Sequence, residues 1–312
     1  MLPTYKASHF LRTALSSVVE QAPASHDMQI EVVDDGSPDE ASRRIVDEVG
    51  GGRVAHFRKP KNEGLVANFN TCIERATGHY VHILHDDDAV LPGFYQTFGR
   101  AFDSHPEVGA AYGRYIEIDG NERWNLLSGL DAPASGPLPN PPLALARRNR
   151  VRTPSVVVRR SLYERIGGFN PRLSHAADWE MWVRLAVNTS IWYEVQPLAL
   201  YRSHASSDTS RLVQTGENIR ELRRCAAVFE EYLPPDIRKG CLALARMWAG
   251  AIALRQVKAF AIRGAFPQAA SNIGEALRCV PRPAEAVLGF MLELKSRIDR
   301  RRRFREAERA GR

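Results

Sequence analysis

The chain has 312 residues, 44% hydrophobic and 25% charged, enough for one large α/β domain with a smaller appendage or for two ordinary domains. The net charge is +7, but nine Lys or Arg against three Asp or Glu lie in the segment 295–312, so the rest of the chain is close to neutral. This distribution excludes a broadly basic surface for nucleic acid, and we expect no nucleic-acid partner.

The four cysteines have neither paired metal-ligand spacing nor the density of a disulfide-rich secreted scaffold. We recognise no secretory signal peptide, and the longest apolar stretch, at 247–254, is far shorter than the roughly 20 residues of a membrane-spanning helix. The sequence therefore predicts a cytoplasmic protein with reduced thiols.

Hydrophobic periodicity predicts alternating strands and helices over the first 85 residues. The expected strands are the end of one at 1–5, then 29–33, 53–58 and 80–84, and the expected helices are 9–21, 40–49 and 65–76. This alternation favours an α/β fold with a mostly parallel sheet and flanking helices. In such sheets ligands bind beyond the carboxyl ends of the strands, so the polar residues that follow each strand are expected to share one rim.

Regular signals are sparser in the second half. A stretch rich in Pro, Gly, Ala and Ser at 131–142 predicts a long loop, before strands at 155–159 and 198–201 and helices at 161–166 and 178–187. From about residue 215 the chain is rich in Ala, Leu and Arg, which is typical of helices. We expect an α/β domain at 1–212 and a helical C-terminal region at 213–312.

Three consecutive aspartates, Asp86, Asp87 and Asp88, follow the apolar strand at 80–84. Carboxylates crowded at the end of a strand repel one another unless a positive group lies among them. Mg²⁺ and Mn²⁺ prefer oxygen ligands and usually bind one or two carboxylates together with substrate phosphates. The triplet therefore favours a divalent-cation site, and a solvated acidic turn is the alternative.

Five local patterns occur in a fixed order along residues 2–205. They are Pro3-Thr4-Tyr5; Val32-Val33-Asp34-Asp35-Gly36-Ser37; Asn62-Glu63-Gly64 with Asn68; Asp86-Asp87-Asp88 with Leu91-Pro92; and Gly167-Gly168-Phe169 followed by Asp178-Trp179-Glu180-Met181-Trp182. With these patterns the chain resembles the family 2 glycosyltransferases, which are inverting enzymes of the GT-A fold that use nucleotide sugars. The resemblance implies a Rossmann-like GT-A domain with a helical C-terminal extension.

By this resemblance, the first patterns bind a donor nucleotide. Asp35 would accept the imide N–H of a pyrimidine base, and Thr4 and Tyr5 would line the base pocket chiefly through their backbone. The implied donor-binding residues are Pro3, Thr4, Tyr5, Asp35, Ser37, Asn62, Gly64, Asn68 and Asp86, with Arg202 as a partner for phosphate. Helix N-capping is the competing account of the Asp and Ser residues, and an ordinary turn that of 62–64. Asp34 either belongs to the pocket or holds the turn at Gly36.

The resemblance also implies a Mn²⁺ or Mg²⁺ cofactor at the aspartate triplet, which corresponds to the family's DXD element. Asp87 would bind the ion with support from Asp88, and Asp86 would lie near the ribose or behind the metal. His204 matches a position where relatives often have a histidine near the metal, with a surface histidine as the alternative. Many relatives have an aspartate where this chain has His85. The ion would neutralise the charge that develops on the departing diphosphate.

Asp178 is the implied general base, which would take a proton from the acceptor hydroxyl as its oxygen attacks the anomeric carbon. Because one displacement inverts that carbon, no enzyme nucleophile is needed. Relatives often have Glu-Asp where this chain has Ala177-Asp178. A helix N-cap is the other role open to Asp178. Trp179 and Trp182 lie three residues apart on one helical face and are expected in the core rather than against an acceptor.

The function expected from the resemblance is transfer of a sugar from a UDP- or dTDP-linked donor to a glycan or lipid-linked acceptor in bacterial surface polysaccharide synthesis. One alternative is a non-catalytic GT-A-like scaffold or regulator, because only Met1-Leu2 precede Pro3 and the first strand is expected to be truncated. A nucleotidyltransferase is the other, although Lys6-Ala7-Ser8 lacks the Gly-rich character of a triphosphate loop.

The C-terminal segment has a basic cluster, Arg300–Arg303, after an apolar helical stripe at 287–294. Such a segment either packs on the catalytic domain as a charged helix or attracts anionic lipid headgroups. The second interpretation predicts peripheral attachment at the inner face of the membrane, which suits an enzyme with a lipid-linked acceptor.

Overall fold

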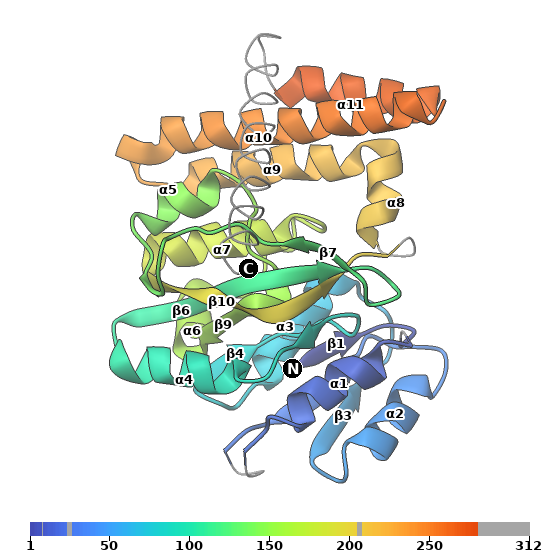
Figure 1. Cartoon of the computed structure of the whole chain (residues 1–312), viewed down its shortest axis with the longest axis vertical. Helices are drawn as coiled ribbons and strands as arrows, with labels where there is room; N and C mark the ends of the chain where they lie inside the picture. Colours follow the sequence, from blue (N-terminus) through green and yellow to red (C-terminus); the bar gives the residue numbers. More distant parts are fainter. Residues whose placement is uncertain (8, 24–26, 205–207, 280–312) are drawn as a thin grey trace, which may run out of the picture. The chain divides into compact units, whose positions relative to one another are not determined.

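The computed structural model describes residues 1–7, 9–23, 27–204 and 208–279 (Figure 1). The chain divides into two compact units, one of Met1–Leu145 with Asn149–His204, and the other of Ala146–Arg148 with the helical region after His204. The apolar stripe at 287–294 and the basic cluster at 300–303 lie outside the described residues.

A parallel sheet of three strands, in the order β1-β2-β3, occupies the N-terminal part of the first unit. It alternates along the chain with helices: β1 (Leu2–Thr4), α1 (Leu11–Val19), β2 (Ile30–Asp34), α2 (Ala41–Val49), β3 (Val54–Arg58) and α3 (Leu65–Arg75). The middle strand β2 is buried along its whole length, as expected for an apolar run covered on both faces. These elements agree with those that periodicity predicts.

A mixed sheet of seven strands follows, with the order β4-β9-β6-β10-β5 and with β7 and β8 paired to β6 and β10. Its strands are β4 (Tyr80–His82), β5 (Ala89–Val90), β6 (Val108–Ile118), β7 (Trp124–Leu127), β8 (Gly136–Pro137), β9 (Val156–Arg159) and β10 (Ser190–Arg202). Only β6 and β10 pair in parallel in this sheet. The expectation of mostly parallel pairing therefore holds for the first sheet, whereas short turns such as that between β6 and β7 return the chain antiparallel in the second.

Strand β1 links the two sheets. It pairs with β2 on one side, and on the other the backbone of Met1 donates to His82 O at 2.9 Å and accepts from Leu84 N at 3.0 Å. The strand is three residues long and lies between β2 on one side and the segment 82–84 on the other. The carboxyl end of β1 therefore lies beside the loop that follows β4.

Helices cover these sheets, and one apolar core joins α1 to both sheets and to α4 (Phe94–Ser104). Phe94, Phe98 and Phe102 of α4 are all nearly inaccessible to solvent. The remaining helices of this part are α5 (Pro141–Ala146), the 3₁₀ turn η1 (Thr153–Ser155), α6 (Arg160–Ile166) and α7 (Ala177–Asn188). Trp179 and Trp182 of α7 are 1% and 4% exposed, which confirms that they belong to the core.

The helical region consists of α8 (Asp208–Thr215), α9 (Glu217–Tyr232), α10 (Pro235–Ile262) and α11 (Phe266–Cys279) (Figure 1). Buried Glu275 of α11 forms ion pairs with Arg220, Arg223 and Arg278, which neutralise its carboxylate. Within the described part of the chain, no helix is both long and apolar enough to cross a membrane. The cysteines Cys72, Cys225, Cys241 and Cys279 are buried, and no disulfide joins them.

The Gly167-Gly168-Phe169 turn is fastened to α3 by the side chain of Asn70. Asn70 Nδ2 donates to Phe169 O at 3.0 Å, and Asn70 Oδ1 accepts from Phe169 N at 2.7 Å. A Cβ atom on Gly168 would lie 2.3 Å from Asn70 Oδ1, closer than packed atoms can approach. Only glycine therefore fits at this position without movement of Asn70.

We expect Gly168→Ala to lower the free energy of unfolding by about 1–3 kcal/mol, because the added methyl group displaces Asn70. Urea unfolding followed by circular dichroism measures the change. Gly99→Ala on α4 is the matched control, since its Cβ meets no atom within 4 Å and alanine favours a helix. An unchanged midpoint for Gly168→Ala would contradict the packing described.

Candidate active site

The aspartate triplet lies in the loop between β4 and β5, next to the carboxyl end of β1. Asp86 Oδ2 accepts a hydrogen bond from Thr4 Oγ1 at 2.5 Å, although 82 residues separate the two in the chain. The backbone of Thr4 also accepts from Asp35 N at 2.8 Å. Three of the sequence patterns are therefore adjacent at one rim, because the hydrogen bonds of Met1 with His82 and Leu84 bring the end of the first sheet beside the loop after β4.

A group of possible metal ligands is centred on this loop. His85, Asp87 and Asp88 each offer one ligand atom, and these atoms lie within 4.8 Å of one another. Asp88 Oδ2 is buried without a hydrogen-bond partner and lies 3.4 Å from His85 Nδ1. Burial, together with the neighbouring charge of Asp87, raises the pKa of Asp88 well above its ordinary value. A divalent cation would pair with these atoms, so the donor set fits a metal.

His204 contributes to the same place from the segment after β10. Its Nε2 lies 3.0 Å from Asp87 Oδ2, and the side chains are 18% and 23% exposed. A mixed set of imidazole nitrogen and carboxylate oxygen suits Mn²⁺ at least as well as Mg²⁺. His85 is therefore a candidate ligand that the sequence analysis did not select, although its place beside the triplet pointed to it.

Arg202 does not face this space, contrary to the expectation that it binds phosphate. Its side chain is 1% exposed, its Nε donates to Asp87 O at 2.7 Å, and its backbone N donates to Asp88 Oδ1 at 2.8 Å. The guanidinium carbon also lies 4.1 Å from the ring centroid of Phe10. Arg202 thus holds the aspartate loop in place, because its N–H donors bind groups of the protein itself.

Asp35 is likewise occupied by donors from the chain. Its carboxylate accepts from the backbone N–H groups of Glu63 and Gly64 and lies 2.8 Å from Lys59 Nζ. Lys59 Nζ lies 2.7 Å from the carboxylate of Glu63 as well. A carboxylate has about four acceptor directions, and these contacts fill them. Asp35 therefore holds the 59–64 loop in this structure and is not open to the base that we expected it to bind.

Asp34 has the structural role rather than a place in the pocket. It accepts from Ser37 N at 2.8 Å and from Ser42 Oγ at 2.5 Å, and these bonds offset the effect of burial and lower its pKa. Ser37 Oγ in turn accepts from Lys6 N at 2.7 Å. Gly36 has a φ of +72°, and a Cβ there would lie 2.5 Å from the carbonyl carbon of Lys61. The turn after β2 therefore packs directly on the 59–64 loop.

The other predicted donor residues divide by exposure. Asn68 is buried, and its Nδ2 donates to Val33 O at 2.9 Å, so it supports β2 rather than facing a ligand. This corrects the expectation for Asn68. Pro3 is buried, Gly64 is half-buried, and Tyr5 and Asn62 are exposed at the rim. Tyr5 and Asn62 remain candidates for contact with a nucleotide.

Asp178 is the second residue of α7 and is not its N-cap, which is Ala176. Its carboxylate accepts from Trp179 N at 2.6 Å and from Asn149 Nδ2 at 3.2 and 3.3 Å. Asn149 holds both carboxylate oxygens through one amide group. This corrects the capping account and identifies Asn149 as a residue of the site that no sequence pattern had indicated.

The charges of Asp178 and of the aspartate triplet both affect the pKa values of His85 and Tyr201. Burial lowers the pKa of His85, and the charges of Asp87 and Asp178 oppose that effect. Burial also raises the pKa of Tyr201 to about 12. The charge of Arg152 opposes this rise, and the charges of Asp88, Asp87 and Asp178 add to it. Asp178 and the aspartate triplet therefore lie near the same two side chains, His85 and Tyr201.

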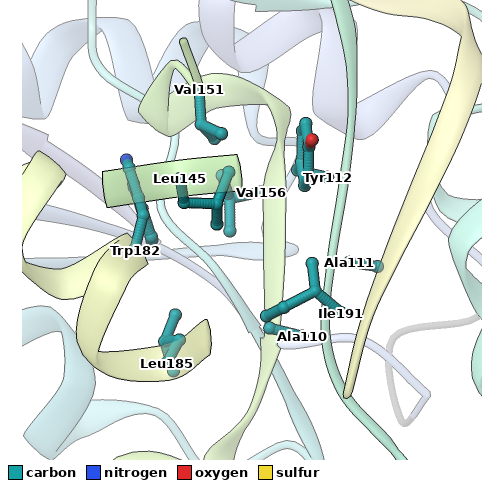
Figure 2. Close-up of a pocket in the computed structure, with 9 residues that line it drawn as sticks. All are labelled: Ala110, Ala111, Tyr112, Leu145, Val151, Val156, Trp182, Leu185 and Ile191. Atoms are coloured by element: carbon teal, nitrogen blue, oxygen red, sulfur yellow. The ribbon is translucent and has the colours of Figure 1, made fainter. Parts of the chain in front are cut away.

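The cavity in Figure 2 is a separate, apolar gap in the core of the first unit. It has a volume of about 10 Å³ and is lined by side chains of β6, β9, β10, α5 and α7 and by Val151. The lining residues are Ala110, Ala111, Tyr112, Leu145, Val151, Val156, Trp182, Leu185 and Ile191. A gap of this size holds at most one water molecule and no nucleotide, so it is not the site.

The family model described as glycosyl transferase family 2 matches residues 1–167 of this chain. An uncharacterised protein of Mycobacterium tuberculosis is 29% identical over 235 residues, which cover 72% of each protein. An uncharacterised glycosyltransferase of Rickettsia felis is 23% identical over 227 residues, which cover 71% of this chain. This chain spans only 36% of the length of the Rickettsia protein.

Solved structures share the fold at low identity. S. aureus TarS 1–349 in complex with UDP-GlcNAc has a TM-score of 0.67 and 16% identity, over 93% of this chain and 88% of that one. The mannosyltransferase PcManGT from Pyrobaculum calidifontis, in complex with GDP-Man and Mn²⁺, has a TM-score of 0.56 and 19% identity, over 93% and 82%.

Proposed function

Because the chain belongs to glycosyl transferase family 2 and has the GT-A fold, we propose that it is a metal-dependent, inverting glycosyltransferase. The observation that carries the proposal is the cluster of possible metal ligands His85, Asp87 and Asp88, with Asp178 near enough for its charge to act on His85. We assign this activity to residues 1–212, with 213–312 as a helical extension. The acceptor in this proposal is a glycan or lipid-linked sugar of a bacterial surface polysaccharide.

The proposed donor is a UDP- or dTDP-linked sugar. In support, the neighbour with the higher TM-score binds UDP-GlcNAc, whereas the other binds GDP-Man. The base would lie between the exposed ring of Tyr5 and the 59–64 loop, which Asp35 holds in place through the backbone of Glu63 and Gly64. Thr4 positions Asp86 beside the ribose in this arrangement.

Asp87, Asp88 and His85 would hold the cation, with His204 beside Asp87. A bound divalent ion supplies Lewis-acid neutralisation of the diphosphate. The chain's own residues do the remaining work. Asp178 accepts the proton of the acceptor hydroxyl, Asn149 keeps its carboxylate oriented, and Arg202 holds the backbone of the aspartate loop in place.

Turnover of a panel of nucleotide sugars tests this function. We expect release of UDP or dTDP from the matching donor in the presence of Mn²⁺, with little release in EDTA or from GDP-mannose. With a sugar acceptor present, proton NMR of the product should show the anomeric configuration opposite to that of the donor. A product with retained configuration would contradict the single-displacement mechanism, and turnover of GDP-mannose alone would contradict the donor class.

A lipid surface is the proposed location of the enzyme, and support comes from α11. Its side chains Phe266, Ile273 and Leu277 are 67%, 45% and 61% exposed and lie along one face of the helix. Between residues 252 and 279 the one acidic residue, Glu275, is buried, whereas Lys258, Arg263 and Arg278 are exposed. Exposed apolar side chains on one helix face, with the exposed cations Lys258 and Arg263 in the same part of the chain, suit the headgroup region of an anionic bilayer.

We expect the wild-type protein to sediment with vesicles that contain phosphatidylglycerol and to do so weakly with phosphatidylcholine alone. The triple variant Phe266→Ser, Ile273→Ser and Leu277→Ser should lower binding about tenfold or more, because it removes the apolar contact. The control is the pair Trp124→Ser and Leu126→Ser on β7, which removes comparable exposed apolar surface elsewhere. Equal loss in both variants, or no binding by the wild type, would contradict this location.

A further inference from the structure

Arg152 has an arrangement unlike that of the arginines around it. Its guanidinium carbon lies 5.0 Å from the ring centroid of Tyr201 and 5.7 Å from that of Tyr115. Its Nε, like that of Arg150, is buried without a hydrogen-bond partner, but its side chain, unlike that of Arg150, forms no ion pair with a described residue. The side chain as a whole is half-buried. Removal of a cation from water costs free energy unless a hydrogen-bond acceptor pairs with it. A bound anion would therefore stabilise this guanidinium.

Neighbouring arginines have protein partners. Arg150 forms an ion pair with Asp131, and Arg114 donates to Ser128 O through both Nε and Nη2. Arg202, described above, donates to backbone carbonyls beneath the aspartate loop. Structural roles therefore account for these three guanidinium groups, whereas the guanidinium of Arg152 lies over two tyrosine rings and forms no ion pair with any residue that the structure describes.

Arg152 lies three residues after Asn149, which holds the carboxylate of Asp178. The carboxylates whose charges act on Arg152 are those of Asp178 and Glu117. The segment 149–152 thus supplies an amide to the proposed base and a cation over the ring of Tyr201, the residue before Arg202, whose backbone donates to Asp88. In an inverting displacement the base lies on the side of the sugar opposite the departing diphosphate, so a group beside the base is on the acceptor side.

We propose that Arg152 binds an oxyanion of the acceptor, a phosphate or a carboxylate, next to the hydroxyl that Asp178 deprotonates. The planar guanidinium matches both anions through paired N–H donors. This inference rests on the proposed function and narrows it, since it selects an anionic acceptor over a neutral glycan. Tyr115 and Tyr201 keep the guanidinium in place by contact with its faces.

The test uses the full chain loaded with Mg²⁺ and its nucleoside diphosphate, with glucose 6-phosphate, glucuronate and glucose as probes in saturation-transfer NMR. We expect at least one charged sugar to bind more tightly than glucose, and which one binds distinguishes phosphate from carboxylate. Arg152→Gln should weaken that binding about tenfold or more while nucleotide affinity stays unchanged, and Arg152→Lys should restore part of it. Arg100→Gln, on the exposed surface of α4, is the control.

Three results would overturn the proposal: equal binding of all three sugars, unchanged binding in Arg152→Gln, or a loss of nucleotide affinity in that variant. The last would place the guanidinium on the donor. Failure of the proposed function is separate, because it appears as absence of nucleotide binding by the wild type before any probe is added. Melting temperatures of the variants verify that each is folded.

Discussion

Replacement of Asp87 by Asn is expected to lower nucleotide release from the donor sugar about a hundredfold or more. Asp87 is the more exposed carboxylate of the cation cluster, and it also contacts His204. Asparagine has nearly the same shape as aspartate but lacks the negative charge that attracts a divalent cation. Asp88 is less suitable for the test, because its carboxylate also accepts from Arg202 N and its loss would disturb the loop.

Titration of Mn²⁺ by electron paramagnetic resonance, alongside a coupled assay for released nucleotide, measures both effects of Asp87→Asn. Weaker Mn²⁺ binding should accompany the slower turnover. Asp47→Asn on α2 is the control, since that exposed carboxylate lies 3.5 Å from Arg43 in an ordinary surface pair. Retention of Mn²⁺ affinity and turnover by Asp87→Asn would remove the cluster from the mechanism.

Asp178→Asn should lower kcat by about 10²–10⁴-fold while nucleotide and metal affinity remain near those of the wild type. The amide cannot accept the proton of the acceptor hydroxyl, whereas its oxygen can still accept from Trp179 N. The helix α7 should therefore persist, and the loss should fall on the chemical step. Steady-state kinetics with calorimetric nucleotide binding separate these quantities.

The control for Asp178→Asn is Asp103→Asn, an exposed residue at the end of α4. A melting temperature within a few degrees of the wild type would show that the variant is folded. Turnover equal to that of the wild type would exclude Asp178 as the base. A parallel loss of nucleotide affinity would instead assign Asp178 to donor binding.

The helices and strands of the N-terminal half were predictable because each has a clear hydrophobic pattern and a turn at its end. The apolar run of β2 and the stripe of α1 are examples. In the second half, β6 extends over 11 residues and β10 over 13, yet β6 was not predicted and only the end of β10 was. Glycines interrupt β6, and irregular pairing interrupts β10, so neither has a sustained period of two.

The residue types identified the edge of the domain at which the candidate site lies, but not which side chains there can bind a ligand. Asp35, Asn68 and Arg202 all carry suitable groups, yet the fold uses those groups to hold its own loops. That outcome depends on backbone donors and carbonyls far away in sequence, which a local motif does not contain. Asn149 was missed for the converse reason, because its place in the site comes from its contact with Asp178 rather than from a motif.

Calorimetric titration of UDP, dTDP and GDP into the wild-type protein, first with Mn²⁺ and then with EDTA, tests the central claim most directly. The account predicts that UDP or dTDP binds in the presence of Mn²⁺, that EDTA weakens this binding at least tenfold, and that GDP binds less well. A folded protein that binds none of the three, or binds one equally well in EDTA, would contradict a metal-dependent nucleotide-sugar site at the aspartate triplet.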